Sequence, residues 1–271
     1  MEKVSIIVPS RNELYLDKTV DNLLKNAREK IEIIVVLDGY EKKPVLPKGV
    51  KTVWRKKPKG MRNAINTGAK KATGKYLMKC DAHCAFDEGY DVKLKGCKEN
   101  WVVVPRRYAI DKNDWGKHKN PDYYYDFQYI SHPKDPDYQF KGVDWPEYGM
   151  RAKGGLVDLM TSQGSCWLMH KTWFDKIGGL DEKNYGTMGA EAQEVCLKTW
   201  LSGGRYVLNR KTWYAHKKKR VGKRGNDRGY RKPRDEWKKS RKYIIKKYAG
   251  DPAFKELVEK FKPVPGWHTN M

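Results

Sequence analysis

A carboxylate and an imidazole stand two residues apart at Asp81 and His83, directly after an apolar run that ends at Cys80. Alternate side chains of an extended segment point to the same side, so both groups face one direction. Together they can hold a divalent metal ion. An isolated Asp-X-His pair is more often structural than catalytic, so the surrounding elements must decide between the two interpretations.

Two further carboxylates, Glu191 and Glu194, lie at the start of a helix predicted over 190–201. Residues three apart share one face of a helix. A carboxylate on such a face can act as a general base and take a proton from a hydroxyl group. The alternative interpretation is that both acids are exposed and simply complement the dipole at the start of the helix.

The elements that must position these groups alternate along the first 80 residues. Apolar runs predict strands, and residues with helical spacing predict helices between them; the predicted strands are 4–9, 31–37, 52–54 and 75–80, and the helices 14–30 and 60–71. This order predicts an α/β fold with a doubly wound, mixed but mainly parallel sheet. In such sheets, ligands bind outside the carboxyl ends of the strands. The polar groups at 9–12, 38–39 and 81–83 are therefore expected to converge.

The remainder of the chain adds predicted strands at 164–170 and 205–209 and helices at 234–248 and after Asp251-Pro252. Between them, residues 121–148 contain nine aromatic residues and several prolines, which predicts an irregular or hairpin insertion. A small aromatic core is the favoured interpretation of most of these rings.

The 271 residues carry a formal net charge of +24, of which +16 lies in residues 205–247. Aromatic residues interleave that basic run, a combination typical of nucleic-acid surfaces, although a solvated tail is the alternative. No apolar run approaches the roughly 18 residues of a membrane span. The five cysteines and the lack of a leader at Met1 predict reduced thiols and a cytoplasmic protein, in the host cytoplasm if it is viral.

Several motifs then occur in the order of a known family. The stretch from Gly60 to Gly68, followed by Asp81-Ala82-His83-Cys84, resembles the nucleotide-sugar glycosyltransferases of the GT-A fold, family 2. The Asp-Ala-His-Cys tetrad is especially similar to polypeptide N-acetylgalactosaminyltransferases. Further matching segments are 6–13, 33–39, 178–182 and 189–194, and His216 occupies the place of a third metal ligand. The resemblance covers about residues 4 to 216.

This resemblance implies roles for individual residues. The metal, Mn²⁺ or Mg²⁺, is expected at Asp81, His83 and His216, and the catalytic acids are Glu191, the expected base, and Glu194. The donor-binding residues are expected to be Pro9, Arg11, Glu13, Asp38, Arg62, Gln163 and Gly164. Arg62 is placed to meet either the donor phosphates or the loop that holds them. Ala192 departs from the Asn or Asp common in the family, and the absence of the signature of processive synthases argues against polysaccharide synthesis.

The implied organisation is a GT-A domain over 1–216 and a basic extension over 217–271. Within the domain, 1–100 form the nucleotide-binding half and 101–216 the acceptor half, with the insertion 121–148. The expected donor is a nucleotide sugar, with UDP favoured. The favoured acceptor is a hydroxymethylated base in double-stranded DNA, by analogy with phage enzymes. The expected DNA-binding residues are Lys217, Lys218, Lys219, Arg220, Lys223, Arg224 and Arg228.

Three alternatives remain open at this point. One is a cytosolic glycosyltransferase that acts on a lipid-linked or cell-surface glycan at an anionic membrane. Another is an inactive GT-A domain that only binds nucleic acid, against which the intact set of acidic and histidine residues argues. A nucleotidyltransferase would want a glycine-rich phosphate loop, and residues 9–14 contain no glycine.

Overall fold

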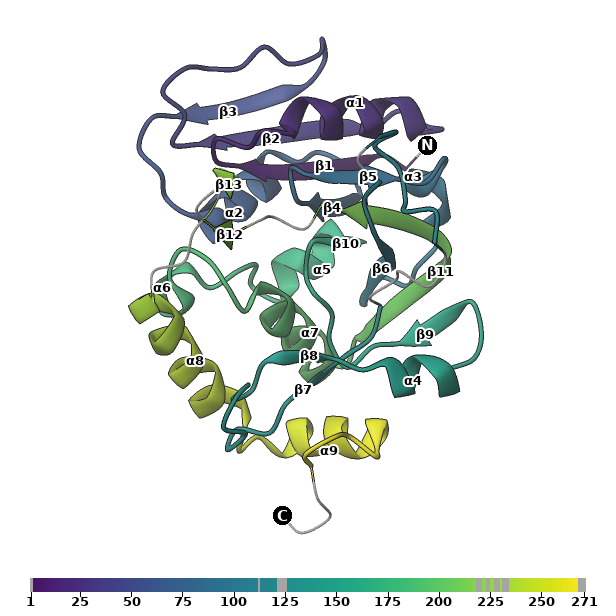
Figure 1. Cartoon of the computed structure of the whole chain (residues 1–271), viewed down its shortest axis with the longest axis vertical. Helices are drawn as coiled ribbons and strands as arrows, with labels where there is room; N and C mark the ends of the chain where they lie inside the picture. Colours follow the sequence, from purple (N-terminus) through teal and green to yellow (C-terminus); the bar gives the residue numbers. More distant parts are fainter. Residues whose placement is uncertain are drawn as a thin grey trace.

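The computed structural model describes residues 2–111, 113–120, 126–217, 221–222, 225–226, 230 and 234–267. The strands of its main sheet are β1 (Val4–Ser10), β2 (Glu32–Asp38), β3 (Lys51–Arg55), β4 (Tyr76–Cys80), β5 (Cys84–Phe86), β6 (Trp101–Ala109), β9 (Leu156–Asp158), β10 (Cys166–His170) and β11 (Arg205–His216). They form one mixed sheet in the order β3-β2-β1-β4-β10-β6-β11-β5, with β9 also paired to β11 (Figure 1). The GT-A-like α/β architecture predicted from the sequence is confirmed.

The first half of the sheet is parallel and runs β3-β2-β1-β4. Every residue of β1, β2 and β4 is buried, which explains their almost continuous apolar sequences. Helices α1 (Leu16–Asn26) and α2 (Met61–Lys71) pack into two different core clusters, through Val20 and Ile65 respectively. They therefore cover opposite faces of the sheet, and the carboxyl ends of its strands remain open.

Strand β11 is longer than the sequence pattern predicted. It pairs in parallel with β6, and its register shifts between Asn209 and Trp213 before the pairing resumes up to His216. The predicted strand ended at Asn209 because the polar residues of this irregularity interrupt the apolar pattern. The continuation matters for the site, since it carries His216 back to the edge where β4 ends.

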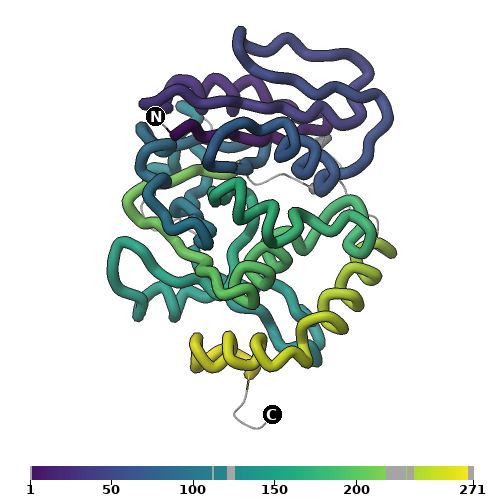
Figure 2. Tube along the Cα trace, turned by 180° about the vertical axis from the view of Figure 1, so that it is seen from behind, coloured from purple at the N-terminus to yellow at the C-terminus, as the bar shows by residue number. Residues whose placement is uncertain are grey.

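The described part of the basic extension, residues 217–271, shares a core cluster with residues before 217. It holds β12 (Val221–Gly222), β13 (Gly225–Asn226), α8 (Arg234–Tyr248) and α9 (Pro252–Phe261). Ile244 and Phe254 of these two helices are buried in the same cluster as Trp167. The helices lie at the end of the molecule away from α1 and β3 (Figures 1 and 2). As predicted, Asp251 begins α9, and its Oδ1 accepts a hydrogen bond of 2.9 Å from the Ala253 amide.

The aromatic insertion contains an antiparallel pair, β7 (Gln128–Ile130) and β8 (Gly142–Asp144), followed by α4 (Pro146–Arg151). Phe127, Phe140 and Trp145 are buried in the core, which confirms the core interpretation for these rings. Residues 123–125, three more of the nine, lie outside the described residues.

The remaining helices are α3 (Tyr90–Lys93), α5 (Lys171–Lys176), α6 (Glu182–Tyr185) and α7 (Glu191–Leu201). Among the described residues, no helix combines the length and apolar character needed to span a bilayer. All five cysteines are free thiols, as expected.

Candidate active site

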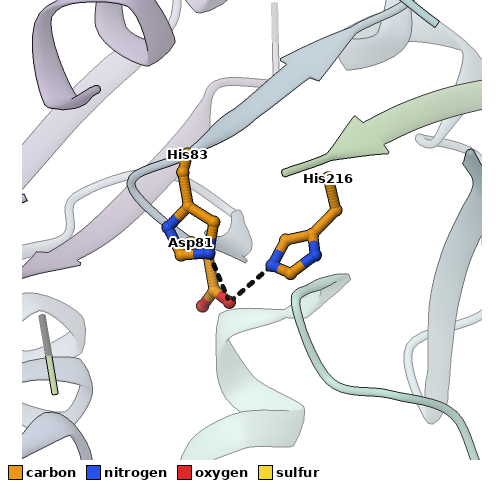
Figure 3. A group of neighbouring side chains, drawn as sticks. All are labelled: Asp81, His83 and His216. Atoms are coloured by element: carbon orange, nitrogen blue, oxygen red, sulfur yellow. Dashed lines mark hydrogen bonds and ion pairs between the residues drawn. The ribbon is translucent and has the colours of Figure 1, made fainter. Parts of the chain in front are cut away.

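Three potential metal ligands meet at the carboxyl end of β4. Asp81 follows that strand, His83 immediately precedes β5, and His216 is the last residue of β11. The antiparallel pairing of β5 with β11 sets His216 opposite Cys84, so the two imidazoles lie side by side (Figure 3). Asp81 Oδ2 lies 3.3 Å from His216 Nε2 and 3.9 Å from His83 Nε2. One ligand atom from each residue lies within 4.8 Å of the others.

The chemistry of these donors fits a divalent metal ion. Neutral imidazole nitrogens and a carboxylate suit Mn²⁺ among the common biological cations. Burial lowers the pKa of His216 to about 4, so its ring is neutral at physiological pH. Burial alone would raise the pKa of Asp81, but the charge of Lys79 and the contact with His216 hold it well below its ordinary value. Asp81 is thus an anion.

Glu13 supports this group from behind. Its Oε2 lies 3.5 Å from His83 Nδ1, and its side chain is only 4% exposed. The carboxylate of Glu13 thus lies on the Nδ1 side of the ring, and Nε2 lies on the side of Asp81. Glu13 was expected to bind the donor; in the structure its carboxylate lies beside a candidate metal ligand.

Lys79 is a residue of this site that the sequence analysis missed. Its ammonium is buried in β4 and donates to Asp81 Oδ1 at 2.8 Å, Glu191 Oε2 at 2.9 Å and the Gly164 carbonyl at 2.9 Å. Burial opposes its charge, but the two carboxylates raise the pKa of Lys79 above its ordinary value. A lysine inside an otherwise apolar strand was the available signal, because buried charges require partners.

Glu191 is tied to this lysine and is not at the cavity surface. It begins α7 and is 6% exposed. Lys79 contacts its Oε2, and the Trp167 indole donates to its Oε1 at 2.7 Å. Both oxygens are therefore engaged in holding α7 against β4 and β10.

Glu194 and Arg62 form a buried ion pair, and neither side chain is exposed to solvent. Arg62 also donates to the Gly189 carbonyl at 2.5 Å, and its guanidinium stacks 4.3 Å from the centre of the Tyr185 ring. Glu194 further accepts from the Asp181 amide at 2.9 Å. Arg62, which was expected to bind the donor, thus holds the loop before α7. Glu194, which was expected to be catalytic, is fully buried in this ion pair.

Breaking this pair is expected to destabilise the fold. Glu194→Gln should lower the free energy of unfolding by about 3–5 kcal/mol, because it leaves the buried Arg62 guanidinium without its described counterion. Arg62→Met should lower it by less, because Glu194 keeps its ion pair with Lys198, whose Nζ lies 2.8 Å from Glu194 Oε1. The double variant should lose less than the sum of the two losses. Urea denaturation of the four proteins measures this coupling. Single variants within about 1 kcal/mol of the wild type would contradict the assignment.

Asp38 is likewise occupied by the protein. It is fully buried, and it accepts from Arg55 Nε at 2.5 Å and from the Lys59 and Gly60 amides, both at 2.8 Å. Gly60 has a φ of +96°, and a Cβ on it would lie 2.7 Å from Thr187. Asp38, which was expected to bind the donor, therefore fixes the tight turn into α2.

The ligand end of the sheet opens into a cavity of about 520 Å³. Its lining residues are Asp81, His83, Arg107, Tyr108, Ala109, Gln128, Asp144, Gln163, Met188, His216 and Tyr230. Of the predicted donor-binding residues, only Gln163 is among them. Pro9 is buried inside β1, which continues to Ser10, and Arg11 is half-buried in the loop that follows. Gly164 contributes its carbonyl to Lys79.

Asp144 is a second residue that the sequence analysis missed, and no motif marks it. It ends β8, is exposed, and lines the cavity. Gln128 donates to its Oδ1 at 2.8 Å, and the described residues place no partner on Oδ2. The described cavity lining contains two carboxylates, Asp81 and Asp144. Asp81 is a candidate metal ligand, and Asp144 is not.

The predicted DNA-binding residues lie largely outside the described part of the chain. This applies to Lys218, Lys219, Arg220, Lys223, Arg224 and Arg228. Lys217 is described: its amide donates to the His83 carbonyl at 3.0 Å, and its ammonium lies 4.4 Å from the centre of the Tyr15 ring. The basic segment therefore starts beside the metal-ligand candidates.

Comparison with known proteins relates this geometry to other chains. The probable N-acetylgalactosaminyltransferase 7 of Caenorhabditis elegans is 27% identical over 237 residues, which cover 76% of this chain and 37% of that protein. The human polypeptide N-acetylgalactosaminyltransferase 10 is 26% identical over 232 residues, covering 76% and 36%. The chain thus spans less than half the length of these curated relatives.

Solved structures share the fold. A crystal structure of GalNAc-T7 with UDP, GalNAc and Mn²⁺ superposes with a TM-score of 0.66 at 20% identity, covering 80% of this chain and 44% of the other. Staphylococcus aureus TarS 1–349 in complex with UDP-GlcNAc gives 0.61 at 15% identity, covering 94% and 71%.

The family model for glycosyl transferase family 2 matches residues 5–178. This stretch begins inside β1, contains the turn at Asp38 as well as Asp81 and His83, and makes up more than half of the sequence. The chain belongs to glycosyl transferase family 2.

Proposed function

We propose that this protein transfers a sugar from a UDP-sugar to a hydroxyl group, in a reaction that depends on Mn²⁺ or Mg²⁺. The observation that carries this proposal is the convergence of Asp81, His83 and His216 in the wall of the cavity. The two solved neighbours support the donor, since one holds UDP, GalNAc and Mn²⁺ and the other UDP-GlcNAc.

The roles of the residues follow from the chemistry of the leaving group. In the reaction the bond between the anomeric carbon and the diphosphate oxygen breaks, and UDP departs with additional negative charge. A bound divalent ion supplies Lewis-acid stabilisation of that charge. Asp81, His83 and His216 would hold the ion. Lys79 would keep Asp81 in place, and Glu13 would do the same for His83.

A new bond forms between the anomeric carbon and the acceptor oxygen, and the hydroxyl proton must go to a base. We assign this role to Asp144, because it lines the cavity and keeps one oxygen without a described partner. Glu191, the base expected from the sequence, is engaged by Lys79 and Trp167. Its proposed role is to position Lys79.

The acceptor that we propose is a hydroxymethylated base in double-stranded DNA. Support for this choice comes from the charge of +16 in residues 205–247, a segment that reaches the rim of the cavity at Lys217. A base inside a duplex would have to be extruded before it could enter, at a cost of a few kcal/mol. The human relative is named a polypeptide transferase, so a peptide must be tested as an acceptor beside DNA.

An acceptor panel tests this function. The protein is incubated with Mn²⁺ and each of several UDP-sugars, alone or with hydroxymethylated duplex DNA, unmodified duplex DNA, a Ser/Thr-rich peptide or a lipid-linked glycan. The proposal expects UDP release above the background of donor hydrolysis only with hydroxymethylated DNA, together with a mass increase of one sugar on that strand. Stimulation by peptide or glycan alone would reject the DNA acceptor and keep the transferase. No UDP release with any donor would reject the transferase.

A further inference from the structure

A second concentration of positive charge lies far from the basic extension in sequence. Residues 41–59, here called the basic edge, contain eight Lys or Arg residues and a single acid, Glu41. Together with residues 205–247, they account for all but one unit of the net charge of +24. The rest of the chain is therefore almost neutral, and the excess charge is confined to two segments.

The basic edge surrounds β3, the last strand on its side of the main sheet. The loop from β2 to β3 projects beyond that edge, at the top of Figure 1. Six lysines of the basic edge are exposed and, in the part of the chain that the structure describes, have no carboxylate within ion-pair distance; they are Lys42, Lys43, Lys48, Lys56, Lys57 and Lys59. By contrast, Lys51 pairs with Glu32 at 2.5 Å and Arg55 pairs with Asp38.

Protection of an edge strand does not account for these six lysines. Charged side chains on a sheet edge prevent pairing with other chains, but β3 itself already carries Lys51 for that purpose. The six lie in the loop before β3 and the turn after it. Concentrating unpaired like charges destabilises a fold through repulsion, which suggests that a polyanion neutralises them.

Tyr230 joins the basic edge to the cavity. Its side chain lines the cavity, and burial together with the negative charge of Asp38 raises the pKa of its hydroxyl well above the ordinary value. Asp38 in turn holds Arg55 and the Lys59 amide of the basic edge. In sequence, Tyr230 lies within the basic segment 217–234. Tyr230 therefore lies beside both the cavity and the turn after β3.

We propose that the basic edge binds the phosphodiester backbone of double-stranded DNA and that, with Tyr230 beside it, it forms one surface leading to the cavity. The inference rests on the proposed function for the identity of the polyanion. An anionic membrane is less well matched, because the loop offers a single fully exposed apolar side chain, Val45, which is 96% exposed. Its neighbour Leu46 is half-buried and packs against the core.

Neutralising the basic edge tests this surface. The variant carries Lys42→Gln, Lys43→Gln, Lys56→Gln and Lys57→Gln, and the matched control carries Lys153→Gln, Lys176→Gln, Lys183→Gln and Lys255→Gln, which are also exposed. Binding of a fluorescein-labelled unmodified duplex is measured by anisotropy as a function of salt. Circular dichroism and UDP release without acceptor confirm that both proteins are folded with an intact donor site.

Each lysine that contacts a phosphate contributes about −0.9 to the slope of log K against log salt. The variant is expected to bind the duplex at least about tenfold more weakly near 0.1 M salt and to show a shallower slope. The control is expected to match the wild type in both affinity and slope. Equal affinity and slope in variant and wild type would overturn the proposal. The proposal would also be overturned if the variant lost binding to phosphatidylserine vesicles while its binding to DNA stayed unchanged. Because the duplex is unmodified, this outcome is independent of whether hydroxymethylated DNA is the acceptor.

Discussion

Asp81→Asn is expected to lower Mn²⁺-dependent UDP release by at least about a thousandfold, the largest effect of any single substitution in this chain. A metal ion contributes several kcal/mol of charge stabilisation to such a step, and each 1.4 kcal/mol is a factor of ten in rate. Asn keeps the shape of Asp81 but removes the negative charge that faces His83 and His216. Steady-state UDP release across an Mn²⁺ titration measures the loss.

Asp175→Asn is the matched control, because Asp175 is 57% exposed and, among the described residues, forms an ion pair only with Lys171 on the same helix. It should leave rate and Mn²⁺ dependence unchanged, since an exposed ion pair of this kind contributes little. Circular dichroism shows whether Asp81→Asn is folded. A folded Asp81→Asn protein with wild-type Mn²⁺ dependence would remove Asp81 from the metal site.

Asp144→Asn is expected to lower sugar transfer by about a hundredfold or more while preserving UDP release by hydrolysis in the absence of acceptor. A general base acts on the acceptor hydroxyl, so its loss spares donor binding. Glu191→Gln should behave differently. It breaks the contact with Lys79, which also holds Asp81, and should therefore raise the Mn²⁺ concentration needed for half-maximal rate in both reactions.

The two readouts separate the roles of these residues. If Glu191→Gln loses transfer alone, keeps its Mn²⁺ dependence and loses the acidic limb of the pH profile, Glu191 is the base and Asp144 is not. If neither substitution affects transfer selectively, no protein side chain acts as the base. The departing diphosphate would then be the better candidate to accept the hydroxyl proton.

The predicted fold was confirmed because it depends on local patterns that tertiary packing does not override. Fully buried parallel strands give unbroken apolar runs such as 31–37, and polar residues after such runs mark the carboxyl ends of strands. That logic placed Asp81 and His83 directly after a strand, where the structure has them. His216 was located through the resemblance to the family, and the bulge in β11 shows why periodicity alone missed its strand.

Contacts between distant elements could not be predicted in the same way. Arg62 lies on a helix whose sequence does not reveal that Glu194, 132 residues later, supplies a buried counterion. Asp38 could equally have faced a ligand, until the turn at Gly60 was seen to use both of its oxygens. Asp144 lies in an irregular segment with no motif, and only the folded cavity brings it near the ligands.

The central claim is that Asp81, His83 and His216 hold a divalent ion that the transfer reaction requires. The most direct measurement is UDP release by the wild-type protein after treatment with EDTA and after Mn²⁺ is restored. The account predicts that release falls to background in EDTA and recovers on addition of Mn²⁺. Release at an undiminished rate in EDTA would contradict it.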